Sequence, residues 1–141
     1  MILLDTSVLS LAFRRQRGVE AEPTVVRVLR QMVLEDIPLT VPGIVLQELL
    51  SGVRSTGQFS RLERLVEGFP ILLAERAHHV AAARIFNVCR RKGISPSAID
   101  CLIAALAISS EAPLLTVDED FQKMASHCHL RLLEIREPYG V

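Results

Sequence analysis

The sequence predicts an α/β fold built around a parallel sheet, and three observations carry this prediction. Short apolar runs alternate with longer segments of helical periodicity along the 141 residues. Several of these runs are apolar at every position, which is typical of strands buried on both faces of a parallel sheet. A helical segment that is apolar except for one charge, Ala98 to Ile108, is followed after a short turn by another such run, as expected of a chain made of βαβ units.

The first predicted strand is Met1 to Leu4, and it ends abruptly at Asp5. A helix is expected to follow through Phe13, and Asp5, Thr6 or Ser7 can cap it. Asp5 therefore has a plain structural interpretation as a helix cap. It also stands at the carboxyl end of a strand, the edge of a parallel sheet where ligands bind.

The next part of the chain predicts a helix, a strand and a second helix. The helix starts at Pro23 or Thr24, and its apolar residues recur at helical spacing: Val25, Val28, Leu29, Met32 and Val33. Ile37 to Val41 is the expected strand, and Ile44 to about Leu50 is the expected second helix. That helix carries Glu48, which either points to solvent or overhangs the edge of the sheet.

The middle of the chain predicts a helix at Phe59 to Gly68, a strand at Pro70 to Leu73 and a long helix at Glu75 to Lys92. Beyond the apolar helix, Leu114 to Val117 is a β-rich run. A short helix at Phe121 to Ala125 and a last strand at Leu130 to Ile135, with Arg131 interrupting it, complete the predicted elements.

Asp100 is the single charge in the apolar helix, and it has two interpretations. Ser97 can cap this helix, and an acid three residues later resembles a capping box with Asp in place of Glu. Alternatively, Asp100 is a functional carboxylate at the edge of the sheet. The run that follows the helix ends in Asp118, Glu119 and Asp120, so a second group of acids reaches the same edge.

Right-handed crossovers between parallel strands bring the acids of these elements to one edge of the sheet. The predicted cluster is Asp5, Glu48, Asp100 and Asp118, with Asp120 as a near neighbour. Packed carboxylates without basic partners repel one another, and a divalent cation resolves that repulsion. Oxygen ligands favour Mg2+ or Mn2+, and the corresponding chemistry is metal-assisted hydrolysis of phosphodiester bonds.

Composition limits the classes of protein to consider. Lys plus Arg and Asp plus Glu number 16 each, so nucleic-acid binding would have to use local basic patches. Three cysteines without a CxxC motif favour a reducing cytoplasm over a disulfide scaffold. No apolar run is long enough to span a membrane, and we expect a cytoplasmic protein with one domain over residues 1–141.

Four segments in order, ILLDTSVLS, VLQELLSG, SPSAIDCLIAALA and LLTVDEDF, resemble the PIN domain family, and in particular the VapC-type toxins of toxin–antitoxin pairs. The resemblance implies a three-layer α/β/α sandwich with a central, mainly parallel sheet. It also implies an Mg2+- or Mn2+-dependent endoribonuclease that acts on RNA, forms a homodimer and is silenced by a cognate VapB-type antitoxin.

The resemblance places the catalytic acids at Asp5, Glu48, Asp100 and Asp118, with metal ligands among them at Asp5, Asp100 and Asp118. Thr6 and Thr116 match its polar supporting positions. Asp118 and Asp120 both fit the pattern of the fourth acid, and the sequence leaves the choice open. The basic run after the first helix supplies our candidates for binding RNA phosphates, which are Arg14, Arg15 and Arg17.

Other classes fit the sequence less well. A receiver-like regulatory module places acids on the same edge, but it requires an adjacent acidic pair after the first strand, where Thr6 and Ser7 stand here. A haloacid-type phosphatase requires an Asp at position 7. A zinc site at His127, Cys128 and His129 lacks further ligands to complete it. A PIN nuclease that is not a toxin is the remaining alternative.

Overall fold

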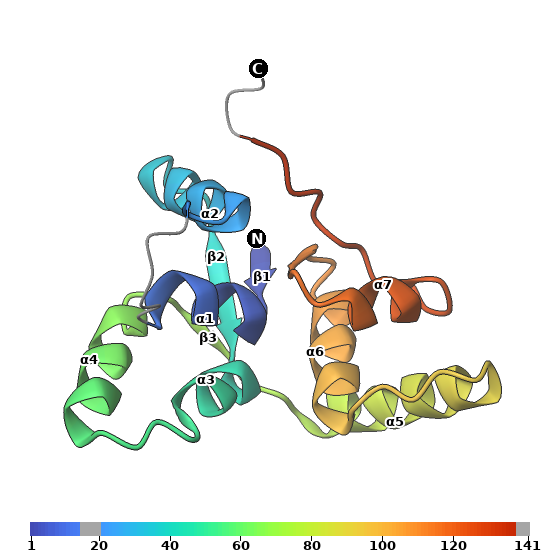
Figure 1. Ribbon diagram of the computed structural model, residues 1–141. Coiled ribbons are helices and arrows are strands. Elements are labelled where there is room, and N and C mark those ends of the chain that lie inside the picture. The colour runs from blue at the N-terminus through green and yellow to red at the C-terminus, as the bar shows by residue number, and fades with distance from the viewer. Residues whose placement is uncertain (15–20, 138–141) are drawn as a thin grey trace.

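A computed structural model describes residues 1–14 and 21–137 of the chain (Figure 1). Its strands are β1 (Ile2–Leu4), β2 (Leu39–Pro42), β3 (Ile71–Leu72) and β4 (Leu114–Leu115). They form a four-stranded sheet in the order β3-β2-β1-β4, and every neighbouring pair is parallel. The predicted parallel sheet is confirmed.

Burial on both faces of the sheet explains why β1 and β4 are apolar at every position. Leu3 and Leu4 of β1, Val41 of β2 and Leu114 and Leu115 of β4 have no exposed surface. A strand buried on both faces has no polar face to alternate with its apolar one, so such strands are recognised by continuous hydrophobic runs.

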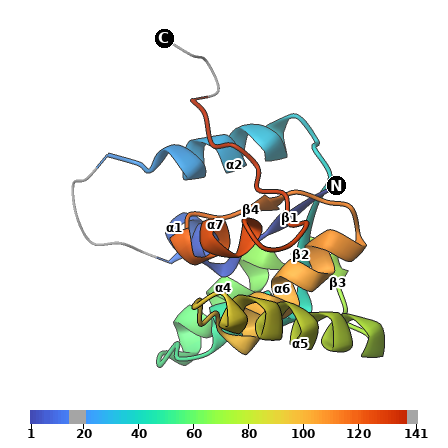
Figure 2. The ribbon, with the colours of Figure 1, turned by 90° about the vertical axis from the view of Figure 1, so that its right-hand side faces the viewer.

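Seven helices connect and flank the strands in the described parts of the chain: α1 (Thr6–Phe13), α2 (Thr24–Leu34), α3 (Gly43–Leu50), α4 (Thr56–Val66), α5 (Arg76–Arg91), α6 (Ala98–Ser109) and α7 (Glu119–Ala125). The chain adds β2 and then β3 on one side of β1, and it then adds β4 on the other side. Right-handed crossovers therefore place the connection through α5 and α6 on the opposite face of the sheet from the earlier helices. Figure 1 shows α4 to the left of the strands and α5 and α6 to their right. The expected three-layer α/β/α sandwich is thus present, and Figure 2 shows it from the side.

Helix α6 is the buried helix that the sequence predicts. Every residue from Cys101 to Ala107 is buried, and the helix packs along α5. Its residues are small or aliphatic, which lets it fit closely between the sheet and α5. The rigid placement of α6 fixes the position of Asp100, which lies in its first turn.

The predicted last strand, Leu130 to Ile135, is wrong. Only Leu132 pairs there, in a single parallel bridge to Leu114. The neighbouring strand, β4, has just two residues, so it offers too short a ladder for a longer partner. The predicted run Leu114 to Val117 is also shorter as a strand, because Val117 N turns away to donate to the Ser7 hydroxyl.

Further boundaries differ from the prediction: β2 begins at Leu39 instead of Ile37, and α7 begins at Glu119 instead of Phe121. Helix α4 begins at Thr56 instead of Phe59, because Ser55 accepts a hydrogen bond from Gln58 N and caps the helix there. Strand β3 contains two of the four residues predicted at Pro70 to Leu73. Leu73 instead lies 71% exposed beyond the end of the strand.

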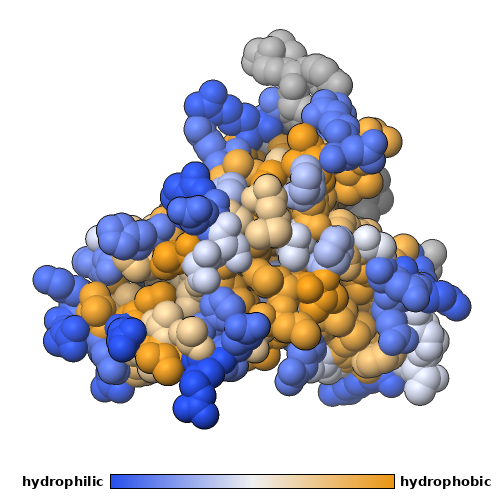
Figure 3. Space-filling view, turned by 180° about the vertical axis from the view of Figure 1, so that it is seen from behind, coloured by the Kyte–Doolittle hydropathy of each residue, from blue (hydrophilic) through white to orange (hydrophobic). Residues whose placement is uncertain are grey.

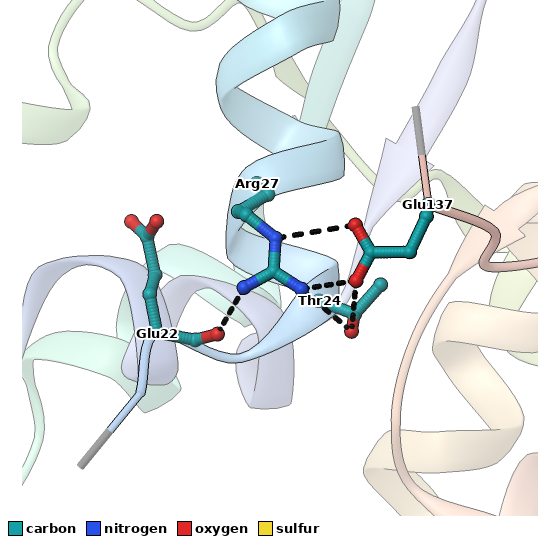
Figure 4. A network of polar contacts seen from close by, with 4 residues as sticks. All are labelled: Glu22, Thr24, Arg27 and Glu137. Carbon is teal, nitrogen blue, oxygen red and sulfur yellow. Dashed lines mark hydrogen bonds and ion pairs between the residues drawn. The ribbon is translucent and has the colours of Figure 1, made fainter. Parts of the chain in front are cut away.

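The C-terminal segment returns to α2 through a polar network (Figure 4). Arg27 pairs with Glu137, and it also donates to Thr24 and to the Glu22 carbonyl oxygen. This network is largely exposed, so water screens it and it contributes little to the stability of the fold. Within residues 1–14 and 21–137, no helix has the length and apolar character needed to cross a membrane.

A candidate metal centre at the edge of the sheet

Asp5 is held in one orientation at the carboxyl end of β1. Its backbone N donates to the Leu115 carbonyl oxygen at 3.1 Å, which continues the pairing of β1 with β4. Its Oδ2 accepts from the Ser7 and Thr116 hydroxyls, both at 2.7 Å, and from Ser7 N at 3.4 Å. Among the described residues no donor reaches Oδ1, so this second oxygen remains available for a ligand.

Ser7 and Thr116 connect the two strands that carry acids. Their hydroxyl oxygens lie 3.2 Å apart, and each also accepts from the backbone beyond β4: Ser7 from Val117 N and Thr116 from Asp118 N. Thr116 is a support that the sequence predicts. Ser7 is not among the residues predicted for the site. The sequence does carry a signal for it, because Ser7 stands two residues after Asp5, the position from which a helix donates to its N-cap side chain.

Glu48 comes from α3, and the structure brings it to the start of α1. The Thr6 hydroxyl donates to Glu48 Oε1 at 2.7 Å, and the Glu48 side chain is partly buried. The interpretation in which Glu48 simply points to solvent therefore does not describe this structure. The two threonines predicted as supports thus donate to different acids: Thr6 to Glu48 and Thr116 to Asp5.

Asp100 occupies the third position of α6, and its carboxylate is not needed for capping. Ser97 is the cap, and its hydroxyl oxygen accepts from Asp100 N at 3.0 Å. In the described part of the chain no reciprocal bond from the Asp100 side chain to Ser97 N completes a capping box. The capping interpretation is thus satisfied by Ser97 and the Asp100 backbone alone, which leaves the carboxylate free.

Asp118 and Asp120 both reach Asp100. One carboxylate oxygen from each of Asp100, Asp118 and Asp120 lies within 4.8 Å of the others. Asp118 caps α7 by accepting from Asp120 N at 2.9 Å, so the two acids are fixed relative to each other. Asp5 is not one of these three, and the choice between Asp118 and Asp120 as the fourth acid stays open.

The electrostatics of Asp100 show how crowded this edge is. The pKa of Asp100 is raised to about 6, mainly by partial burial; repulsion by Asp118, Asp5 and Glu48 contributes to this rise, and the Ser97 hydroxyl opposes it. The three other predicted acids therefore all act on Asp100, although they come from other parts of the chain. A group of acids placed so that one resists ionisation is characteristic of a binding or catalytic centre.

This raised pKa predicts how stability depends on pH. Because the pKa of Asp100 is higher in the folded protein, its protonation stabilises the fold fully below about pH 3.8, and that contribution is lost as pH rises through about 6. Without metal, the wild type should therefore lose stability relative to Asp100→Asn as pH rises over this range. Melting temperatures of both proteins across pH, in EDTA, measure the difference; a constant difference would contradict the crowding of Asp100.

The donor set fits a hard divalent cation. Every candidate ligand is a carboxylate oxygen, and hydroxyls support two of them. None of the ion pairs among the described residues involves these acids. Oxygen ligands without a basic partner select Mg2+ or Mn2+ over zinc. The described residues do not support the zinc alternative, because no metal-ligating group among them includes His127, Cys128 or His129.

The three arginines predicted to bind RNA have different outcomes. Arg14 is exposed, and its Nη2 donates to the Leu49 carbonyl oxygen at 2.8 Å, which ties the end of α1 to the end of α3. This contact uses one of its five N–H donors and leaves the others for a ligand. Arg15 and Arg17 lie outside the described residues.

The fold and the acidic edge define a PIN domain, and comparison with known families agrees. The model of the PIN domain family matches residues 2–126, and the chain belongs to this family. It is 36% identical over 138 residues to the VapC ribonuclease Mb1587 of Mycobacterium bovis and, equally, to the ribonuclease VapC11 of Mycobacterium tuberculosis. Both alignments cover 96% of this chain and 100% of the relative.

A solved structure of VapBC2 from Rickettsia felis, bound to a DNA fragment from its promoter, shares the fold. The TM-score is 0.75 at 22% sequence identity, over 94% of this chain and 98% of the other. Together with the family assignment, this agreement confirms the predicted PIN-like fold and leaves the receiver-like and phosphatase interpretations without support.

Proposed function

We propose that this protein is a metal-dependent endoribonuclease and the toxin of a toxin–antitoxin pair. The observation that carries the proposal is the meeting of Asp100, Asp118 and Asp120 at the edge of the sheet, where nothing in the described chain neutralises them. The similarity to VapC ribonucleases supports RNA as the substrate. Residues 1–141 would act as one PIN-like domain.

Asp5, Asp100 and Asp118 would hold Mg2+ or Mn2+, with Asp120 close enough to replace or assist Asp118. A divalent ion bound there would supply Lewis-acid stabilisation of the phosphate and lower the pKa of the attacking water. Asp5 Oδ2 is occupied by Ser7 and Thr116, so its Oδ1 would face the ion. Glu48, oriented by the Thr6 hydroxyl, would position the water or accept its proton at the free oxygen, Oε2.

The carboxylates are oriented by hydrogen bonds before substrate binds, and this preorganisation favours catalysis. Hydroxyl and backbone donors hold Asp5, Glu48 and Asp118 before any substrate arrives, so little reorganisation is needed during the reaction. Arg14 would contact a phosphate of the bound RNA beside this centre.

The partner we propose is a VapB-type antitoxin, by analogy with the VapBC2 complex of Rickettsia felis. A homodimer is also proposed, since large apolar side chains remain exposed, among them Leu73 at 71% and Val80 at 45%. Figure 3 shows hydrophobic residues gathered across the middle of the face behind that of Figure 1. The free thiols of Cys89, Cys101 and Cys128 fit a cytoplasmic location.

Cleavage of single-stranded RNA by the purified protein, freed of any inhibitor, tests the proposed function. We expect internal cuts with Mg2+ or Mn2+, no cleavage in EDTA, and recovery when Mg2+ is added in excess of the chelator. Cleavage that continues undiminished in EDTA would refute the metal mechanism. A protein that leaves a broad set of RNAs intact with either ion would refute the assignment as a ribonuclease.

A further inference from the structure

A cavity lies where the end of α1 meets the connection between α3 and α4. Its volume is about 420 Å³. Three arginines line it, Arg14, Arg54 and Arg61, together with the amide side chain of Gln58 and the apolar side chains of Phe13 and Leu62. These residues come from three separate segments, so the fold brings the basic groups together.

Among the described residues, nothing compensates the positive charge of this cavity. No acid is among the residues that line it, and none of the ion pairs in residues 1–14 and 21–137 involves its arginines. Guanidinium groups stay charged at any physiological pH, so the three cations repel one another unless an anion binds. The cavity is therefore electrostatically complementary to a negatively charged ligand.

Structural roles explain only part of this cluster. Arg14 binds the Leu49 carbonyl oxygen in the last turn of α3, where a cation is expected. Arg61 lies in the middle of α4, and the residue that complements the end of that helix is Arg64. Arg54 follows the end of α3 and, like Arg61, has an exposed side chain. Within residues 1–14 and 21–137, Arg54 and Arg61 thus make no hydrogen bond or ion pair that holds the fold.

The cavity is connected to the acidic edge by the same two helices. Helix α1 runs from Thr6, which binds Glu48, to Phe13 beside the cavity, and its eight residues span about 12 Å. Helix α3 carries Glu48 and also Leu49, which binds Arg14. A strand of RNA with one phosphodiester at the acidic edge would therefore have a neighbouring phosphate within reach of the cavity.

We propose that Arg54 and Arg61, with Arg14, form a subsite for a backbone phosphate of the RNA that flanks the cleaved bond. The inference rests on the proposed function. An acidic centre repels the polyanion that it must cleave, so affinity has to come from cations placed elsewhere. Arginine suits this task because its planar fork binds phosphate oxygens in pairs, and the Gln58 amide adds a further donor.

A matched pair of double variants tests the subsite. Arg54→Ala/Arg61→Ala removes two cations from the cavity, whereas Arg64→Ala/Arg84→Ala removes two exposed cations elsewhere, one of them on the same helix. Binding of a short, labelled single-stranded RNA is measured in EDTA between about 50 and about 200 mM salt. The cavity variant should lose about 0.7 per arginine, or about 1.4 in total, from the slope of log K against log salt. The control variant should keep the wild-type slope.

Two further measurements separate phosphate binding from other causes. Arg54→Lys/Arg61→Lys should retain most of the slope, because counterion release depends on charge. With Mg2+, Arg54→Ala/Arg61→Ala should raise KM for long RNA while cleavage of a dinucleotide, which has no flanking phosphate, stays at the wild-type rate. If this variant lost as much activity on the dinucleotide as on long RNA, the proposal would be overturned, because the defect would then lie in the acidic centre.

Equal salt slopes for the cavity and control variants would also overturn the subsite while RNA cleavage by the wild type stood. An acidic protein segment is the competing occupant. A cavity variant that binds RNA normally but loses its protein partner would decide for that occupant and against RNA. If the wild type cleaves no RNA, the proposed function fails, and a reduced slope would still identify the cavity as an RNA-binding site.

Discussion

Replacing Asp100 by asparagine is expected to reduce RNA cleavage by at least about 100-fold, because a displaced metal ion removes several kcal/mol of transition-state stabilisation. The structure gives the reason for choosing this residue. The Asp100 carboxylate meets Asp118 and Asp120 within 4.8 Å, while its backbone N alone serves the Ser97 cap. Single-turnover cleavage of labelled RNA measures the loss.

The same substitution should act on stability in the opposite direction from an ordinary loss of contact. Without metal, Asp100→Asn relieves repulsion by Asp118, Asp5 and Glu48, so it should melt at an equal or higher temperature. With an assumed millimolar dissociation constant, about 10 mM Mg2+ stabilises the wild type by roughly 1.4 kcal/mol. Asp100→Asn should lose most of that shift in melting temperature.

Ser97→Ala is the matched control for Asp100. It removes the cap of the same helix without changing charge, and should lower stability by about 0.5–2 kcal/mol while keeping the shift with Mg2+. The contrary result is an Asp100→Asn protein that behaves like Ser97→Ala: it melts lower, responds fully to Mg2+ and still cuts RNA. Asp100 would then only stabilise the start of α6 and would not belong to the site.

Asp5 is expected to show the second large effect, and two substitutions divide its roles. Asp5→Asn keeps an oxygen for the Ser7 and Thr116 hydroxyls but loses the charge and the free carboxylate oxygen. It should fold with nearly wild-type stability and cleave RNA at least about 100-fold more slowly. RNA cleavage and the melting temperature of each variant provide the measurement.

Asp5→Ala should be inactive and also less stable. Asp5 is only 4% exposed, so removing its carboxylate leaves the Ser7 and Thr116 hydroxyls without their acceptor, which costs about 1–3 kcal/mol. If Asp5→Asn cleaved RNA as fast as the wild type while Asp5→Ala merely melted earlier, Asp5 would be a helix cap and a structural support only.

Two acids of the candidate site, Asp5 and Asp100, could be singled out in the sequence because each breaks a local pattern. Asp100 is the one charge in an apolar helix, and Asp5 ends a wholly apolar strand. The apolar helix and the apolar strand are both buried in the fold, and burial is directly visible in the sequence as a run of apolar residues. The topology rule then predicts that acids at strand ends and helix starts share one edge, and Asp100 does meet the acids of α3, β1 and α7 there.

Other features depend on contacts between segments far apart in the chain. The Leu130 to Ile135 run has strand composition, but pairing needs a partner ladder, and β4 is too short to provide one. Ser7 and Thr116 are separated by 109 residues, so their shared hold on Asp5 appears only in the folded chain. The basic cavity likewise combines single arginines, each of which looks like ordinary surface charge in the sequence.

Anomalous diffraction from a crystal soaked in Mn2+ tests the central claim most directly, since it locates the ion without relying on activity. The account predicts a peak bounded by carboxylate oxygens of Asp5 and Asp100, with Asp118 or Asp120 completing the protein ligands. The same soak of Asp100→Asn should show no peak, or a much weaker one. A wild-type crystal with ordered acids and no manganese among them, at a concentration that supports RNA cleavage, would contradict it.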